Sequence, residues 1–269
     1  MSNFLIWEII LLSIIQGTTE FFPISSSGHL VLAQKLLNIR EPQILLNIVL
    51  HLGTLFAIVI YLKEEIKELI IGFKNFLLYP AKELKTPQIR TIFQIIIATV
   101  PTVLIGYFFN KPLEKAFGSL RAVSISLLIT GLFLFITKFS KEKKNNRLIL
   151  HPLVIGIFQG MAIVPGLSRS GFTIGVALLL GWERERAAKF SFLIFIPAII
   201  GAFIFEISKI QLYLQNLLIL LFGFIMTFIV GILSLTFLMK VIKKGSFSSF
   251  SLYCFIIGLL ALLLSFITK

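Results

Sequence analysis

Four ionisable side chains lie inside the apolar stretches of this sequence and are the first candidates for chemistry: Glu20, His29, His51 and Arg169. An ionisable group is costly to keep in apolar surroundings, so its presence there usually marks a functional site. Glu20, His29 and Arg169 fall in two short segments rich in serine and glycine, whereas no motif surrounds His51. We therefore expect the first three to act together and His51 to be structural.

The two serine- and glycine-rich segments have the composition of an anion-binding site. Each precedes an apolar run that we interpret as a short helix, whose first backbone N–H groups and positive dipole end can bind an anion. Arg169 adds a guanidinium, which suits phosphate oxygens. The hydroxyl groups that would complete the pocket belong to Ser25, Ser26, Ser27, Ser168 and Ser170. A phosphate-containing ligand fits these donors best.

Two further pairs suggest how such a ligand could be processed. Gln16 and Glu20 are four residues apart and share a helix face, so their oxygens could hold Mg²⁺ or Ca²⁺, and Glu20 could be a general base. His29 follows Ser26 by three residues and could activate this serine or a water, or protonate a leaving oxygen. The structural alternatives are helix capping by the serines and an Arg169–Glu20 ion pair that only joins the two segments.

The composition indicates the elements that hold these residues. Of 269 residues, 57% are hydrophobic and 14% are charged, and the mean hydropathy is +0.99. A chain this short cannot bury so much apolar surface in a water-soluble fold, which excludes soluble enzymes as well as disordered and fibrous proteins. The net charge of +13 would suggest nucleic acid in a soluble protein. Here the charges lie between apolar runs, so the partner is the lipid bilayer and not nucleic acid.

Six apolar runs are long enough to cross a bilayer as helices. They cover approximately residues 45–62, 92–109, 121–138, 190–208, 217–239 and 247–267. Two other apolar regions, 4–37 and 151–181, are interrupted by proline, glycine and the polar segments described above. We interpret these two as re-entrant helical hairpins; a single kinked spanning helix is the alternative. Because Lys35 is the first basic residue, we expect no cleaved signal peptide.

The two interrupted regions resemble each other at a fixed offset of 143 residues. Gln16-Gly17 aligns with Gln159-Gly160, Ser25 with Ser168, and Ser27-Gly28 with Ser170-Gly171. Each region precedes three predicted spans, so the chain divides into repeats of about 1–140 and 148–269 within a single membrane domain, 1–269. An odd number of crossings per repeat inverts the second repeat relative to the first. The predicted fold is therefore all-α, with six transmembrane helices and two re-entrant hairpins as inverted-topology repeats.

The distribution of lysine and arginine predicts the orientation of the chain in the membrane. With six spans, seventeen of these residues fall on one side and seven on the other, with Arg169 inside the second hairpin. The more basic side is expected in the cytoplasm, which places both termini outside. Cys254 is the only cysteine, so an intramolecular disulfide is excluded.

The two motifs resemble the signatures of a known family. The segment from Gln16 to His29 (QGTTEFFPISSSGH) and the segment from Pro165 to Thr173 (PGLSRSGFT) are similar to the first and second signatures of the undecaprenyl-diphosphate phosphatases, the bacitracin-resistance proteins. The resemblance extends over the chain in length, span plan and order of motifs. The first position of the first motif is glutamate or glutamine in the family. Here it is Gln16, and an amide side chain cannot act as a carboxylate.

The resemblance implies a bacterial multi-pass cell-membrane hydrolase that converts undecaprenyl diphosphate to undecaprenyl phosphate and inorganic phosphate. This reaction recycles the lipid carrier for peptidoglycan and other wall polymers and confers bacitracin resistance. A divalent cation and an active site open to the outer face are also implied, and a homodimer is one option for assembly. The positions that match functional residues of the family are Glu20, Ser26, His29, Ser168, Arg169 and Thr173.

These inferences combine into one mechanism and one rival. Glu20, Ser26, His29 and Arg169 are the candidate catalytic residues, with Ser26 as nucleophile, His29 as its base and Glu20 as cation ligand. Direct attack by water is the variant. Substrate binding is assigned to Gln16, Ser25, Ser27, Ser168, Ser170 and Thr173. The rival is a polyprenyl-phosphate flippase that uses the same anion pocket, because inverted repeats with broken helices are typical of transporters.

Overall fold

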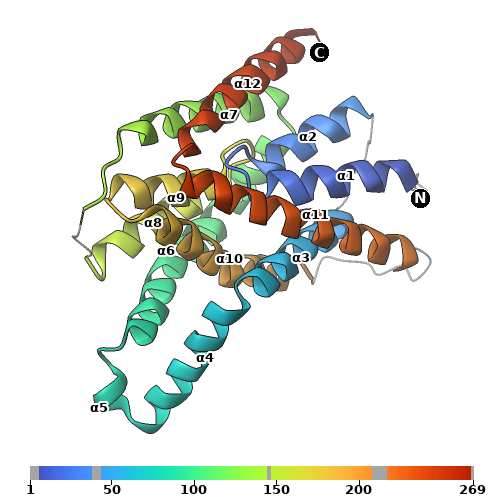
Figure 1. The fold of residues 1–269 in the computed structure, drawn as a ribbon. Helices are drawn as coiled ribbons and strands as arrows, with labels where there is room; N and C mark the ends of the chain where they lie inside the picture. The colour runs from blue at the N-terminus through green and yellow to red at the C-terminus, as the bar shows by residue number, and fades with distance from the viewer. Residues whose placement is uncertain (1–5, 38–43, 144–146, 208–216, 268–269) are drawn as a thin grey trace.

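The computed structural model describes residues 6–37, 44–143, 147–207 and 217–267, and the statements below apply to these residues. All of their regular elements are helices (Figure 1). The all-α class is therefore confirmed. The expected end of the fourth span, at residue 208, lies outside the described residues.

Five helical segments are long and apolar enough to cross a membrane. Two of these segments include a short 3₁₀ turn: η1 (Thr137–Phe139) follows α7, and η3 (Phe247–Ser249) precedes α12. The helices are α6 (Pro87–Phe117), α7 (Leu120–Ile136), α10 (Arg184–Ile207), α11 (Leu217–Lys243) and α12 (Phe250–Ile267). The protein is accordingly a multi-pass membrane protein. Several of these helices begin before the apolar run that predicted them, because polar residues at a membrane surface extend a helix at little cost.

The predicted span 45–62 corresponds to α3 (Ile44–Tyr61), which is followed after Leu62 by α4 (Lys63–Leu78). The two helices are bent by 75° at Leu62. The charged residues that begin α4 explain the bend, because they disfavour a straight continuation through lipid. After the short helix α5 (Pro80–Glu83), the chain returns along α4 into α6 (Figure 1).

The two interrupted regions form pairs of short helices that pack against each other. The first pair is α1 (Ile6–Thr19) with α2 (Ser26–Leu36), and the second is α8 (Leu150–Met161) with α9 (Arg169–Leu179). The expectation that the polar residues precede the second helix of each pair needs correction. Ser25 and Ser168 do precede it as N-caps, whereas the residues after them, Ser26 to Gly28 and Arg169 to Gly171, form its first turn.

The packing of the two halves is reciprocal. Helix α1 packs against α11 of the second half, and α8 packs against α6 of the first, while α7 and α12 pair with each other. A Cβ atom on Gly17 would lie 2.8 Å from Val230 Cβ, and one on Gly160 would lie 2.6 Å from Ile105 Cδ1. Glycine at both positions thus permits equivalent close contacts. This exchange of partners is what two symmetry-related repeats require, although the repeat boundaries themselves stay a prediction.

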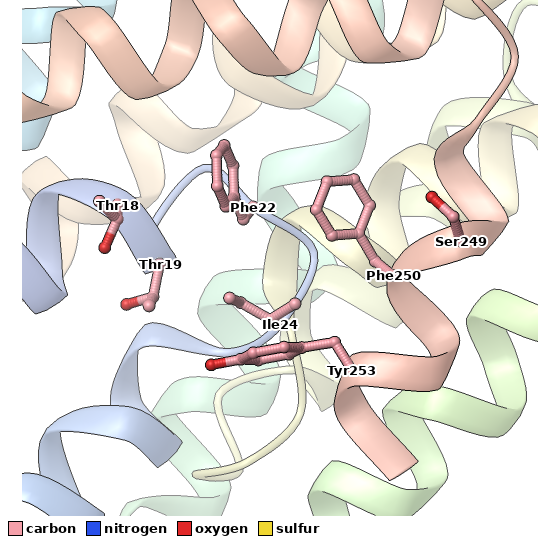
Figure 2. A pocket seen from close by; sticks show the side chains of 7 residues that line it. All are labelled: Thr18, Thr19, Phe22, Ile24, Ser249, Phe250 and Tyr253. Carbon is pink, nitrogen blue, oxygen red and sulfur yellow. The ribbon is translucent and has the colours of Figure 1, made fainter. Parts of the chain in front are cut away.

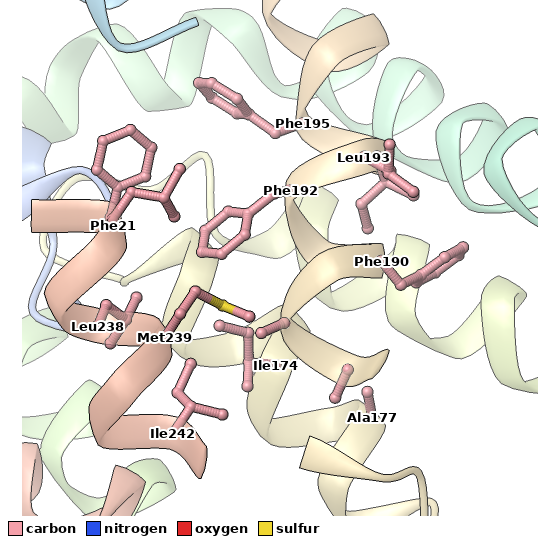
Figure 3. Close-up of a cluster of buried hydrophobic side chains, with 14 of the residues drawn as sticks. Phe21, Ile174, Ala177, Phe190, Phe192, Leu193, Phe195, Leu238, Met239 and Ile242 are labelled. Atoms are coloured by element: carbon pink, nitrogen blue, oxygen red, sulfur yellow. The ribbon is translucent and has the colours of Figure 1, made fainter. Parts of the chain in front are cut away.

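A buried apolar cluster fixes the first polar segment against the second half of the chain. Phe21 is fully buried and meets the ring of Phe192 on α10 edge-on, with 5.8 Å between centroids. Leu238 and Met239 of α11 belong to the same cluster (Figure 3). Because Phe21 directly follows Glu20, this packing holds the Glu20 backbone in place.

Candidate active site

The two short helices that carry the polar motifs begin in the same way. Ser25 Oγ accepts a hydrogen bond from the Gly28 N–H at 3.2 Å, and Ser168 Oγ accepts one from the Gly171 N–H at 3.1 Å. In each cap, a second serine hydroxyl lies 3.3 Å from the first, from Ser27 and Ser170 respectively. Capping with the side chain satisfies a backbone donor that the helix itself leaves free. The expected structural role of Ser25 and Ser168 is therefore present in the geometry.

The two polar segments touch each other. A Cβ atom on Gly28 would lie 3.1 Å from Gly166 Cα, and Ser170 Oγ donates to the Phe22 carbonyl at 3.2 Å. Thr130 of α7 steadies the second segment, because its hydroxyl donates to the Gly166 carbonyl and accepts from the Ser168 N–H. Glycine is required at position 166, where φ is +93° and a Cβ atom would overlap the Val123 carbonyl oxygen.

An ion pair joins the two segments at their contact. Arg169 Nη2 donates to Glu20 Oε1 at 2.7 Å, and the side chains are 14% and 5% exposed. The partners are 149 residues apart in sequence. The motifs predicted from sequence to form one site therefore do meet, with a charge-assisted hydrogen bond between them.

The second oxygen of the Glu20 carboxylate has three polar neighbours. Ser26 Oγ donates to Oε2 at 2.6 Å and Gln16 Nε2 donates at 2.9 Å, while His51 Nε2 lies 3.6 Å away. Glu20 is thus the residue around which the site is built. The contact with Ser26 places a carboxylate where a general base for that hydroxyl is needed.

Arg169 is held by more than its carboxylate partner. Its guanidinium carbon lies 3.4 Å from the centroid of the Phe195 ring, a cation–π arrangement. Among the described residues, its Nη1 is buried and has no hydrogen-bond partner. One terminal nitrogen of the guanidinium, Nη2, is therefore occupied by Glu20, and the other, Nη1, is available to an oxygen of a ligand.

His29 lies in the same segment but has other partners. Its Nδ1 is 2.8 Å from the Ser25 carbonyl oxygen, which can only accept, so Nδ1 carries the hydrogen. The Nε2 atom lies 2.9 Å from Tyr253 Oη, and the two rings are stacked. The structure therefore brings Ser26 to Glu20 and His29 to Tyr253, whereas the sequence paired Ser26 with His29.

Thr173, the remaining predicted residue of the second motif, contacts the backbone of Arg169. Thr173 Oγ1 donates to the Arg169 carbonyl at 2.8 Å and also contacts Ser191 Oγ of α10. Both hydroxyl groups are buried. Thr173 thus positions the first turn of α9 in the free protein.

The family model for bacitracin resistance protein BacA matches residues 9–260 of this chain. The chain belongs to the BacA family. A relative from Thermosipho africanus (strain TCF52B), named undecaprenyl-diphosphatase, is 43% identical over 254 residues, covering 94% of this chain and 97% of the relative. A protein of the same name from Desulfatibacillum aliphaticivorans is 40% identical over 272 residues, covering 97% and 99%. The resemblance stated from the two motifs is confirmed.

Two residues of this BacA-family chain could hold a divalent cation. The Gln16 Oε1 atom is buried and has no hydrogen-bond partner among the described residues, and its amide lies beside Glu20. No cluster of three or more His, Cys, Asp or Glu side chains forms a metal cage within the described ranges. Mg²⁺ is commonly bound by one or two carboxylates together with water and substrate phosphates. Glu20 is the one carboxylate available here, and the Gln16 amide oxygen could add a second protein ligand.

Sequence reasoning missed three contacts of the BacA-family site. His51 was assigned a structural role, yet it lies beside Glu20; its position inside an apolar span was the available signal. Tyr253 of α12 contacts His29, and Phe195 of α10 contacts Arg169. Both belong to aromatic-rich spans, where nothing local distinguishes them from lipid-facing residues.

Proposed function

We propose that this protein hydrolyses undecaprenyl diphosphate to undecaprenyl phosphate and inorganic phosphate, and thereby recycles the lipid carrier of cell-wall synthesis and confers bacitracin resistance. The proposal rests chiefly on one observation: Glu20 binds the Ser26 hydroxyl with one carboxylate oxygen and Arg169 with the other. A nucleophile, a base and a phosphate-binding cation are thus adjacent. Curated relatives with the name undecaprenyl-diphosphatase support the choice of substrate.

In the first step, Ser26 Oγ attacks the terminal phosphorus of the diphosphate. The new P–O bond forms as the bond to the bridging oxygen breaks, and undecaprenyl phosphate departs with the electron pair. Glu20 accepts the Ser26 proton, for which the 2.6 Å hydrogen bond is suitably placed, and passes it to the departing phosphate. The free Nη1 of Arg169 binds an oxygen of the transferred group, since phosphoryl transfer depends mainly on positioning and charge stabilisation.

In the second step, a water attacks the phosphoserine. The bond between phosphorus and Ser26 Oγ breaks, one water proton restores the hydroxyl through Glu20, and inorganic phosphate leaves with the other. Direct attack of water on the diphosphate, with Glu20 as base, is the variant. A trapped phosphoserine at Ser26 supports the serine pathway, and its absence together with full activity of Ser26→Ala supports the variant.

Glu20 and Gln16 Oε1 are the residues that would hold a divalent cation, Mg²⁺ or Ca²⁺. When bound, such a cation supplies positive charge that offsets the charge of the diphosphate. Ser25, Ser27, Ser168, Ser170 and Thr173 hold the two helix starts at this site, and their role in substrate binding stays a prediction.

The excess of lysine and arginine on one side supports a cytoplasmic location for that side and an outer location for both termini. The resemblance to the family, and not the charge distribution, supports an active site that opens to the outer face of the bacterial cell membrane. Single cysteines introduced near the start of α1 and near Lys82 of α5, in a Cys254→Ser background, test this orientation. An impermeant maleimide applied to intact cells should label the first and spare the second.

Phosphate release from undecaprenyl diphosphate by the purified protein in detergent, with and without a chelator, tests the activity. Release by wild type and none by Glu20→Gln is the expected result. The exchanged packing of the two halves favours one rival, a polyprenyl-phosphate flippase, which releases no phosphate in this assay. Light scattering of the same preparation distinguishes a monomer from a homodimer.

A further inference from the structure

Helix α4 has an exposed surface that takes no part in the mechanism above. The helix extends from the rest of the protein together with α5 and the start of α6 (Figure 1). Among the described residues, none of the hydrogen bonds around Glu20 comes from α4, and no residue of α4 lines the pocket beside this site (Figure 2). The α4 surface can therefore be changed without altering the catalytic groups.

The contacts of α4 with the rest of the protein fix which way the helix faces. A Cβ atom on Gly72 would lie 2.6 Å from Gln88 Cβ of α6, and the Phe76 ring meets a phenylalanine ring of α6 edge-on. In the first turn, Glu65 pairs with Lys189 of α10 at 2.8 Å. At about 100° per residue, Gly72, Phe76 and Glu65 share one face of the helix. The half of α4 opposite Gly72 is thus directed away from the protein.

This outward half of α4 combines apolar side chains with positive charge. Five large apolar side chains on it are each between 47% and 66% exposed: Ile70, Ile71, Phe73, Leu77 and Leu78. Three exposed lysines lie among them: Lys63, Lys67 and Lys74. At about 100° per residue, the three glutamates of α4 all fall on the half that includes Gly72. The outward half therefore carries positive charge and no negative charge.

Such a surface is typical of a helix that lies along an anionic bilayer. Its apolar side chains enter the boundary between headgroups and acyl chains, while the flexible lysine stems let the ammonium groups reach the phosphates. The 75° bend at Leu62 suits this position, because a helix at that angle to a spanning helix runs nearer to the bilayer plane than to its normal. The lysines also lie on the side expected in the cytoplasm, where the leaflet contains anionic lipid.

A second copy of this chain fits the outward half less well. In a contact with two-fold symmetry, this half would meet an identical surface. The three lysines of each copy would then approach those of the other with no carboxylate on either surface, and like charges brought together oppose association. Phosphodiester headgroups supply the negative charge that a second copy lacks.

We propose that the outward half of α4 binds anionic phospholipids at the cytoplasmic surface of the membrane. Its apolar side chains lie among the upper acyl chains, and Lys63, Lys67 and Lys74 contact the lipid phosphates. The ion pair between Glu65 and Lys189 holds the first turn of α4 to α10 and so keeps this half directed toward the bilayer. The interaction uses no residue of the active site and is independent of the proposed hydrolysis.

Nitroxide labels on the full-length protein test where α4 lies, in nanodiscs of phosphatidylcholine with about one quarter phosphatidylglycerol. Ile70→Cys and Leu77→Cys place the label on the outward half, and Glu68→Cys and Asn75→Cys place it on the other half, each in a Cys254→Ser background. The first two labels should be accessible to oxygen, which concentrates in the bilayer, and shielded from a water-soluble nickel chelate. The last two should show the reverse. Nickel access at all four positions, or protection of the first two from both reagents by a protein partner, overturns the proposal.

Neutralising the lysines tests the part played by the headgroups. The test variant replaces the three lysines of α4: Lys63→Gln, Lys67→Gln and Lys74→Gln. The control variant removes the same charge from exposed lysines elsewhere on the expected cytoplasmic side: Lys138→Gln, Lys141→Gln and Lys244→Gln. At the Leu77→Cys label, the test variant should lower the ratio of oxygen to nickel accessibility at least about threefold, and the control should keep the wild-type ratio. Equal ratios in the two variants would contradict a role for the α4 lysines in binding anionic lipid.

Discussion

The two polar segments share one architecture and divide the chemistry between them. Both follow a short helix and start the next one with a serine cap, and both place a second serine hydroxyl 3.3 Å from the first. At the offset of 143 residues, however, Ser26 aligns with Arg169 and Glu20 aligns with Ile163. One segment thus carries the hydroxyl and the carboxylate, and the other carries the guanidinium.

The helices that precede the two segments, α1 and α8, also carry an equivalent residue with different partners. Gln16 Nε2 donates to Glu20, whereas its counterpart Gln159 donates to Thr102 Oγ1 at 3.1 Å on the neighbouring helix α6. A repeated glutamine therefore binds the Glu20 carboxylate in one copy and contributes to helix packing in the other. The two repeats thus share the backbone arrangement of this site. Differences at single aligned positions determine which repeat supplies the carboxylate and the hydroxyl and which supplies the guanidinium.

The largest effect is expected from the hydroxyl at the Glu20 carboxylate. Ser26→Ala removes the nucleophile and should lower kcat for undecaprenyl diphosphate by about 10⁴-fold, as expected when a nucleophile is lost. Ser265→Ala removes a hydroxyl that donates to the Leu262 carbonyl within α12, and as the control it should keep the activity. Phosphate release in detergent measures both. Equal effects of the two changes would remove the special role of Ser26.

Arg169, the counterpart of Ser26, should give the next largest effect. Arg169→Ala should lower kcat/KM by roughly 10²–10³-fold, since one charge-stabilising donor is lost. Arg169→Lys should recover only part of this, because lysine lacks the planar fork that binds Glu20 and a phosphoryl oxygen together. Arg121→Ala removes a guanidinium that stacks on Phe266 and serves as the control. Near-normal turnover by Arg169→Ala would contradict the anion-binding role.

The paired glutamines provide a smaller test. Gln16→Glu adds a second carboxylate beside Glu20 and should lower the Mg²⁺ or Ca²⁺ concentration needed for half-maximal activity by about tenfold. Gln159→Glu faces a helix-packing contact and should leave the cation requirement unchanged while lowering the melting temperature. Activity titrations against free cation, together with thermal unfolding in detergent, measure both. An unchanged requirement in Gln16→Glu would place the cation elsewhere.

The two helix caps should give the smallest effects, measured here on stability. Ser25→Ala and Ser168→Ala should each destabilise the protein by about 1 kcal/mol, the usual value of a serine cap. Ser25 has a φ of 70°, in the region that favours glycine, whereas Ser168 has a φ of −84°. Ser25→Gly should therefore cost less than Ser25→Ala, with a smaller difference at position 168. Thermal unfolding of the four variants checks this ranking.

The sequence predicted those parts of the fold and site that depend on local patterns. Apolar runs predicted the helices, and the charged residue in each polar segment predicted that Glu20 and Arg169 belong together. The 75° bend after α3 was not predicted, because an apolar run ends in the same way whether the helix stops or turns. The contacts of His51 and Tyr253 depend on how distant helices pack, which no local pattern encodes; Tyr253 is 224 residues from His29.

The link between Glu20 and Arg169 has a consequence for biogenesis. Because the two residues lie in different halves of the polypeptide, a nascent chain that has inserted only its first half lacks the guanidinium, and a fragment of the second half lacks the carboxylate and the serine. On the proposed mechanism, turnover begins only after synthesis and insertion are almost finished. Two separately expressed halves should each be inert and should regain activity when they associate in the same membrane.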